Sequence, residues 1–169
     1  MYKEFIAEKT CESQKITKIV AALYQGVATG RRGMKTQEIF FPFDPVAKGR
    51  PKFTRTGHAY TPKKTSDYEK AIRDHYQEEG GELFVGPIEV KLVFQMPVPK
   101  GYPKRVVKQI EEGTIKHMKR PDLDNMAKAI LDALNEVAFT DDSHITKLTL
   151  VKRYSFFPGT TMTIKEDVD

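Results

Sequence analysis

The pattern of apolar and polar positions along the chain predicts four strands and three helices. Between residues 88 and 96, apolar side chains occupy every second position, which is the period of a strand with one buried face. We predict a central or near-central strand there. In three other segments, apolar residues recur at the 3.6-residue spacing of an amphipathic helix, at residues 10–25, 65–79 and 126–137.

Shorter segments complete the predicted secondary structure. Residues 38–43 are rich in β-forming side chains and contain Pro42, which favours an edge strand or the end of a strand. Residues 145–154 and 160–164 hold many β-branched and aliphatic side chains, so we predict a final pair of strands there. A helical turn is expected at residues 106–112.

The chain has 169 residues and a mass of 19.3 kDa, which suits one domain with a substantial core. We divide it into an N-terminal extension, residues 1–35, made of a short helix and a basic linker, and a folded domain, residues 36–169. No apolar run approaches the roughly 20 residues of a membrane span, and the N-terminus does not resemble a signal peptide. The single cysteine, Cys11, agrees with a reducing compartment. We therefore expect a cytoplasmic protein without a membrane partner.

Positive charge is concentrated in two segments. The net charge is +5 and the isoelectric point is about 9.2. Residues 48–64 carry six Lys or Arg and no acid, and residues 99–120 carry seven against two Glu. Basic side chains interleaved with aromatic ones on a loop are typical of contacts to a nucleic-acid backbone, although an ordinary solvated loop is the alternative. The residues that we predict to bind DNA are Lys48, Arg50, Lys52, Arg55, Lys63, Lys119 and Arg120.

Carboxylates gather at both ends of the third predicted helix. Asp122 and Asp124, separated by one residue, precede the helix, and Asp141 and Asp142 follow it. Lys128 lies four residues after Asp124, on the same helical face. If the strand that follows the helix packs along it, the second acidic pair brings one carboxylate back to the first.

Three carboxylates at one point repel one another, so the cluster needs a cation or must take up a proton. Oxygen ligands without a usable Cys or His group favour Mg²⁺, or Mn²⁺ in its place. Such an ion activates water for attack on phosphorus, and Lys128 would stabilise the charge on the phosphate. Each feature also has a structural interpretation, namely an aspartate that caps the helix, an acidic turn at residues 141–142 and a surface ion pair of Lys128. The role of Asp132 is left open.

Four short motifs follow one another in the second half of the chain. They are Arg-Pro-Asp-Leu-Asp-Asn at residues 120–125, Lys-Ala at residues 128–129, Leu-Asp-Ala-Leu-Asn at residues 131–135 and Asp-Asp at residues 141–142. Together with Gly-Arg-Pro-Lys-Phe at residues 49–53, they resemble the RusA-type Holliday junction resolvases of bacteria and their phages. The resemblance covers most of the chain.

The resemblance implies an α/β fold of the α+β kind, in which a single domain combines a small mixed β-sheet with packed helices. It also implies a homodimeric, Mg²⁺-dependent endonuclease that resolves four-way DNA junctions by paired symmetric nicks in recombination and repair. Asp141 is an alternative to Asp142, because the link between the helix and the acidic pair is about one residue shorter than expected. The implied catalytic residues are Asp122, Asp124, Lys128 and Asp142, and the three aspartates are the implied metal ligands.

Two other functions stay open. The protein could bind branched DNA without cutting it, or it could be another Mg²⁺-dependent phosphoryl-transfer enzyme that acts on a small phosphate ester. The two basic segments argue against a small substrate, because it does not need a broad cationic surface. Residues 1–35, which the family pattern does not need, form either a real extra helix or the result of an upstream start, with Met34 as the usual first residue.

Overall fold

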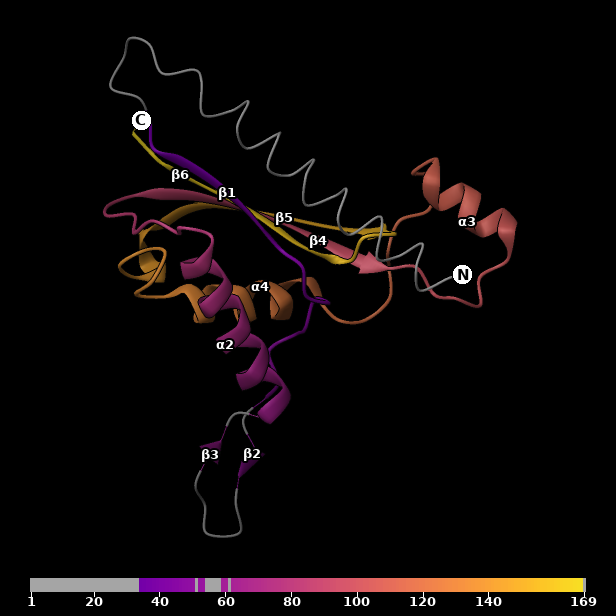
Figure 1. The fold of residues 1–169 in the computed structure, drawn as a ribbon, viewed down its shortest axis with the longest axis horizontal. Coiled ribbons are helices and arrows are strands. Elements are labelled where there is room, and N and C mark those ends of the chain that lie inside the picture. The colour runs from indigo at the N-terminus through magenta and orange to yellow at the C-terminus, as the bar shows by residue number, and fades with distance from the viewer. Residues whose placement is uncertain (1–33, 51, 54–58, 61, 169) are drawn as a thin grey trace. The chain divides into compact units, whose positions relative to one another are not determined.

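The computed structural model describes residues 34–50, 52–53, 59–60 and 62–168 (Figure 1). The helix predicted at residues 10–25 lies outside the described residues, so the helix and the division of the chain into an extension and a domain stay predictions. Within the described part of the chain, no helix is both long and apolar enough to cross a membrane.

A four-stranded mixed β-sheet with the order β1-β6-β4-β5 is the main structural layer. β4 is antiparallel to β6 and parallel to β5, whereas β1 is antiparallel to β6. The predicted central position of β4 and the predicted edge position of β1 are confirmed. The strands are β1 (Thr36–Phe41), β4 (Ile88–Pro97), β5 (Ile145–Ser155) and β6 (Gly159–Glu166).

Both strands predicted near the end of the chain are present, but they do not pair with each other. β4 lies between β5 and β6 and pairs with both of them. The chain therefore crosses the end of β4 within residues 156–158. Gly159 follows immediately, at a place where an added Cβ would lie 2.4 Å from the ring of Phe40. This crossing is short and sterically constrained.

Two helices, α2 (Lys63–Glu78) and α4 (Leu123–Leu134), pack on one face of the sheet (Figure 1). Both were predicted from their apolar periodicity. A third helix, α3 (Lys104–Glu111), follows β4 in the sequence, where only a helical turn was predicted. The observed strands and helices confirm the predicted α+β fold with a small mixed sheet.

The loop between β1 and α2 contains a short antiparallel ribbon formed by β2 (Lys52–Phe53) and β3 (Ala59–Tyr60). α2 then begins at residue 63 rather than at the predicted residue 65. Thr65 is buried within the first turn, and its hydroxyl accepts a hydrogen bond from Gly49 N at 3.2 Å. This hydrogen bond fastens the loop to the start of α2.

The core lies between the sheet and the helices α2 and α4. The side chains of Ile88, Leu92 and Phe94 on β4 are fully buried. Met126 and Ile130 on α4 are equally buried within the same cluster. Each buried side chain of this size contributes roughly 1.5–3 kcal/mol relative to an exposed one. α4 is therefore held firmly by one face, and its opposite face carries polar side chains in solvent.

Candidate active site

Helix α4 presents its charged side chains on the side opposite Met126 and Ile130. Asp124 and Lys128 are exposed there, one helical turn apart. Asp122 occupies the N-cap position with extended backbone, at φ −73° and ψ 144°, but its carboxylate makes no capping hydrogen bond. Negative charge near a helix N-terminus is favourable because of the helix dipole. The start of α4 therefore tolerates two carboxylates that the described structure leaves without a hydrogen-bond partner.

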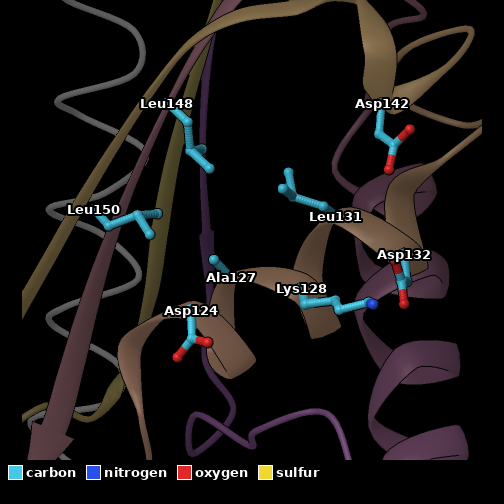
Figure 2. A pocket seen from close by; sticks show the side chains of 8 residues that line it. All are labelled: Asp124, Ala127, Lys128, Leu131, Asp132, Asp142, Leu148 and Leu150. Atoms are coloured by element: carbon cyan, nitrogen blue, oxygen red, sulfur yellow. The ribbon is translucent and has the colours of Figure 1, made fainter.

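A pocket of about 250 Å³, called the α4 pocket below, opens along the exposed face of α4 and the first half of β5 (Figure 2). Asp124 and Lys128 line it from the helix, and Asp142 reaches it from the turn before β5. Figure 2 shows Asp124 and Asp142 at opposite ends of this pocket, with the side chain of Lys128 extending towards Asp132. The second acidic pair thus contributes one carboxylate, Asp142, to the pocket that Asp124 lines. The pocket is lined by Asp124, Ala127, Lys128, Leu131, Asp132, Asp142, Leu148 and Leu150.

Asp141 and Asp142 have different surroundings. The carboxylate of Asp141 accepts a hydrogen bond from Ser143 N at 2.9 Å and caps the short 3₁₀ helix η1 (Asp142–His144). Hydrogen bonds from the side chain and the backbone of Ser143 hold the pKa of Asp141 below its usual value. Asp142 lines the α4 pocket instead. The structural interpretation as an acidic turn therefore applies to Asp141.

Asp122 lines a different concavity from Asp124, although the sequence predicted that both belong to one cluster of carboxylates. This second pocket, of about 610 Å³, lies where residues 45–49 meet the first turns of α2 and α4. Among the described residues, no three Asp, Glu, His or Cys side chains are grouped closely enough to hold one metal ion. The second pocket is lined by Pro45, Val46, Ala47, Gly49, Pro62, Lys64, Thr65, Arg120, Pro121, Asp122 and Asn125.

Asp132, whose role the sequence left open, lines the α4 pocket and also belongs to an ion-pair group that we call the Lys48 cluster (Lys48, Glu69 and Asp132). Lys48 Nζ lies 2.5 Å from Glu69 Oε1 and 2.7 Å from Asp132 Oδ2. Partial burial lowers the pKa of Lys48, but the hydrogen bonds to Asp132 and Glu69 outweigh burial, so the pKa is raised. Lys48 N also donates to Asn125 O at 2.8 Å. The ammonium group that we predicted to bind DNA is therefore already paired with two carboxylates.

The other cations predicted to bind DNA have less restricted surroundings where they are described. Arg120 is exposed and lines the second pocket beside Lys64. Lys64 belongs to the basic segment of residues 48–64 but was not among the residues predicted to bind DNA. Its place directly before the predicted start of a helix at residue 65 could have indicated it. Arg55 and the side chain of Lys52 lie outside the described residues. The remaining exposed residues of the predicted set are Arg50, Lys63 and Lys119.

Carboxylates and a lysine in one exposed pocket, beside exposed cations, suit the cleavage of a phosphodiester. A family model described as "Endodeoxyribonuclease RusA" matches residues 42–165. The chain is also 30% identical over 129 residues to the uncharacterized protein YqaN of Bacillus subtilis (strain 168), a match that covers 73% of this chain and 91% of that protein. The chain belongs to the RusA family of endodeoxyribonucleases, which act on branched DNA junctions. The resemblance seen in the sequence is confirmed.

Proposed function

We propose that the protein is a cytoplasmic, Mg²⁺-dependent endonuclease that resolves four-way DNA junctions by paired symmetric nicks in recombination and repair. One observation carries this proposal. Asp124, Lys128 and Asp142 come from two separate parts of the chain and line one exposed pocket. Metal-dependent hydrolysis of a phosphodiester uses carboxylates to bind the cation and a positive group for the phosphate oxygens, and this pocket offers both.

The donor set suits Mg²⁺, with Mn²⁺ as a substitute, because it offers carboxylate oxygens without Cys or His. Asp124 and Asp142 supply two ligands from the α4 pocket, and we assign Asp122 as the third. A bound Mg²⁺ supplies activation of a water molecule and polarisation of the phosphate. Since the described residues contain no preformed group of three such ligands, the assignment requires the side chain of Asp122 to turn towards the α4 pocket.

Lys128 is the residue that we assign to the phosphate. Its ammonium group lines the α4 pocket, and no described carboxylate forms an ion pair with it. A lysine ammonium group is a compact charge with three donors, so it can bind a nonbridging oxygen and stabilise the charge that develops there. Lys128 thereby differs from Lys48, whose ammonium group forms ion pairs with Glu69 and Asp132.

The second pocket supports the placement of DNA beside these residues. Lys64 and Arg120 line it, and neither α2 nor α4 has a side-chain hydrogen bond at its N-cap. Backbone amides at helix N-termini and basic side chains both favour phosphate. We therefore assign this pocket to a backbone phosphate close to the one that is cut.

Paired nicks need two active sites, which we assign to a two-fold homodimer. β5 supports this assignment because, in the sheet formed by the described residues, it is an edge strand of 11 residues. An exposed edge strand is a template for pairing with another chain. Leu148 and Val151 on β5 are 42% and 37% exposed, and Leu148 also lines the α4 pocket. A partner that pairs with β5 would therefore border the active site.

The test is cleavage of a synthetic mobile four-way junction by the purified full-length protein in Mg²⁺. We expect nicked duplex products, and we expect Asp124→Asn to lower the cleavage rate by roughly 100-fold or more, because it removes a charged ligand. Asp141→Asn is the matched control, since Asn keeps an oxygen that can accept the hydrogen bond from Ser143. No cleavage by the parent protein, or equal cleavage by Asp124→Asn, would contradict the proposal.

A second candidate function is binding of branched DNA without cleavage. The observation that favours it is that the described residues hold no preformed group of three metal-ligating side chains. This function predicts tight junction binding in EDTA and no cleavage after Mg²⁺ or Mn²⁺ is added. The junction assay therefore separates the two functions directly.

A further inference from the structure

Three large apolar side chains are exposed near the end of β5. Met118 is 87% exposed, Phe156 is 51% exposed and Phe157 is 54% exposed. The two phenylalanines occupy the crossing between β5 and β6, and Met118 belongs to the segment that leads into α4. Large apolar side chains that stay in solvent together often mark a binding surface.

These side chains are attached to a partly buried aromatic layer. The ring of Tyr154, two residues before Phe156, packs against the ring of His117 with 4.6 Å between their centroids. The hydroxyl groups of Tyr154 and Tyr102 are 3.2 Å apart. The layer therefore joins the end of β5 to the residue that precedes Met118.

The crossing that carries the two phenyl rings is pre-organised. Ser155 Oγ accepts a hydrogen bond from Phe157 N and donates one to Phe157 O, both at 3.0 Å. The crossing ends at Gly159, where only glycine avoids the ring of Phe40. Side chains held on such a rigid turn lose little conformational entropy when they bind a partner.

The surroundings of these apolar side chains are cationic. Lys152 Nζ donates hydrogen bonds to the carbonyl oxygens of Lys119 and Pro121, at 2.9 and 3.0 Å, and so holds this segment against β5. The Lys119 ammonium group lies 5.0 Å from the centroid of the Tyr102 ring. Residues 113–121 contain no acid. The exposed cations of this segment are Lys116, Lys119 and Arg120.

We propose that Met118, Phe156 and Phe157 form a stacking surface for the nucleobases at the branch point of DNA. The proposal rests on the proposed function. A continuous duplex hides the faces of its bases, whereas a branch point can expose them. Apolar and aromatic side chains bind base faces by stacking or wedging, and neighbouring cations hold the backbone. The surface selects branched over linear DNA, and residues 119–121 connect it directly to Asp122.

The experiment measures DNA binding by a Phe156→Ala/Phe157→Ala variant of the full-length protein, in EDTA so that no strand is cut. Loss of one stacked base predicts about tenfold or more weaker binding to a four-way junction, with binding to a linear duplex of the same sequence unchanged. Val85→Ala removes another exposed apolar side chain, which is 73% exposed, and should change neither affinity. A 2-aminopurine at the branch point should change its fluorescence with the parent protein and not with the double variant.

Equal weakening for junction and duplex, or no weakening for either, would overturn the proposal. Sedimentation of the double variant tests whether a second copy of this chain covers the surface instead. If the substitution converts a parent dimer into a monomer, the surface belongs to the interface between copies and the proposal is wrong. A parent protein that binds the junction without cutting it would contradict only the proposed nuclease function, because the stacking test does not depend on cleavage.

Discussion

Helix α4 borders two groups of lysine and carboxylate side chains. The two groups have similar chemistry, but the charges are paired in one and unpaired in the other. In the Lys48 cluster, the ammonium group lies within 2.7 Å of both carboxylates, and the three side chains are only 19–30% exposed. In the α4 pocket, Asp124, Lys128 and Asp142 are exposed and, among the described residues, form no ion pair. Charges that the fold has paired stabilise it, whereas charges that the fold leaves unpaired can bind a ligand.

The largest effect should come from Lys128→Ala in the α4 pocket. We expect junction cleavage to fall by roughly 100- to 1000-fold, because a charge that stabilises the transition state is lost. The free energy of unfolding should change by no more than about 0.5 kcal/mol, because the side chain is exposed and unpaired. Single-turnover cleavage and urea denaturation measure the two quantities. Lys70→Ala removes an exposed lysine that pairs with Asp74 on α2, and it should cut like the parent.

A lower free energy of unfolding for Lys128→Ala, together with an unchanged cleavage rate, would contradict this difference between the two groups. Such a result would mean that the charge of Lys128 stabilises the fold, as the charge of Lys48 does.

The opposite result is expected for Lys48→Met, which leaves Glu69 and Asp132 without a counter-charge. Breaking a fully buried pair costs about 3–5 kcal/mol, and partial exposure should reduce the loss here to about 1–3 kcal/mol of unfolding free energy. Urea denaturation measures this loss. A Lys48→Met/Asp132→Asn double variant should recover part of it, because one unpaired charge is removed. Unchanged stability of Lys48→Met would show that the pairing contributes nothing.

The stabilisation by Lys48 should depend on pH. Since the pKa of Lys48 in the folded state is raised above the ordinary value of 10.5, the charged form stabilises the fold below that pH. The stabilisation is lost as the pH rises through the raised pKa. The difference in unfolding free energy between the parent and Lys48→Met should therefore be constant near neutral pH and should shrink in strongly alkaline solution. A difference that persists unchanged in strongly alkaline solution would contradict the assignment.

The smallest effect is expected for Asp141→Ala, which removes the cap of η1. The pKa of Asp141 lies below its ordinary value of 3.8, so the charged carboxylate stabilises the fold above that pH. The stabilisation is lost as the pH falls through the lowered pKa. Thermal denaturation should show a slightly lower melting temperature for the variant at neutral pH and no difference in strong acid. Asp141→Asn should melt close to the parent at neutral pH, because Asn also accepts the hydrogen bond.

Features that follow from a periodic pattern within one helix or strand were predictable from the sequence. Contacts between side chains of different elements were not. The alternation at residues 88–96 predicts β4 because its buried face is continuous, and the spacing of Asp124 and Lys128 predicts one helical face. Periodicity says nothing about what lies opposite that face. Lys48 and Asp132 are far apart in the sequence, so their ion pair arises only from the packing of the loop against α4.

The choice between Asp141 and Asp142 could not be predicted from the sequence either. Two adjacent residues of one type give no signal to separate them. Hydrogen bonding from Ser143 to the carboxylate of Asp141 makes the difference, and it depends on the backbone of the turn. The RusA family match confirms the class of protein, but the surroundings of each carboxylate follow from local geometry.

The inner position of β6 has a consequence for synthesis of the protein. β6 lies between β1 and β4, although both of these strands are made much earlier. The sheet therefore cannot close on the ribosome until residues 159–166 have left the exit tunnel, although β4 can pair with β5 before that. A nascent chain that is released before these residues are made would hold two separated parts of a sheet. Loss of β6 would thus divide the domain, whereas loss of an edge strand would only shorten the sheet.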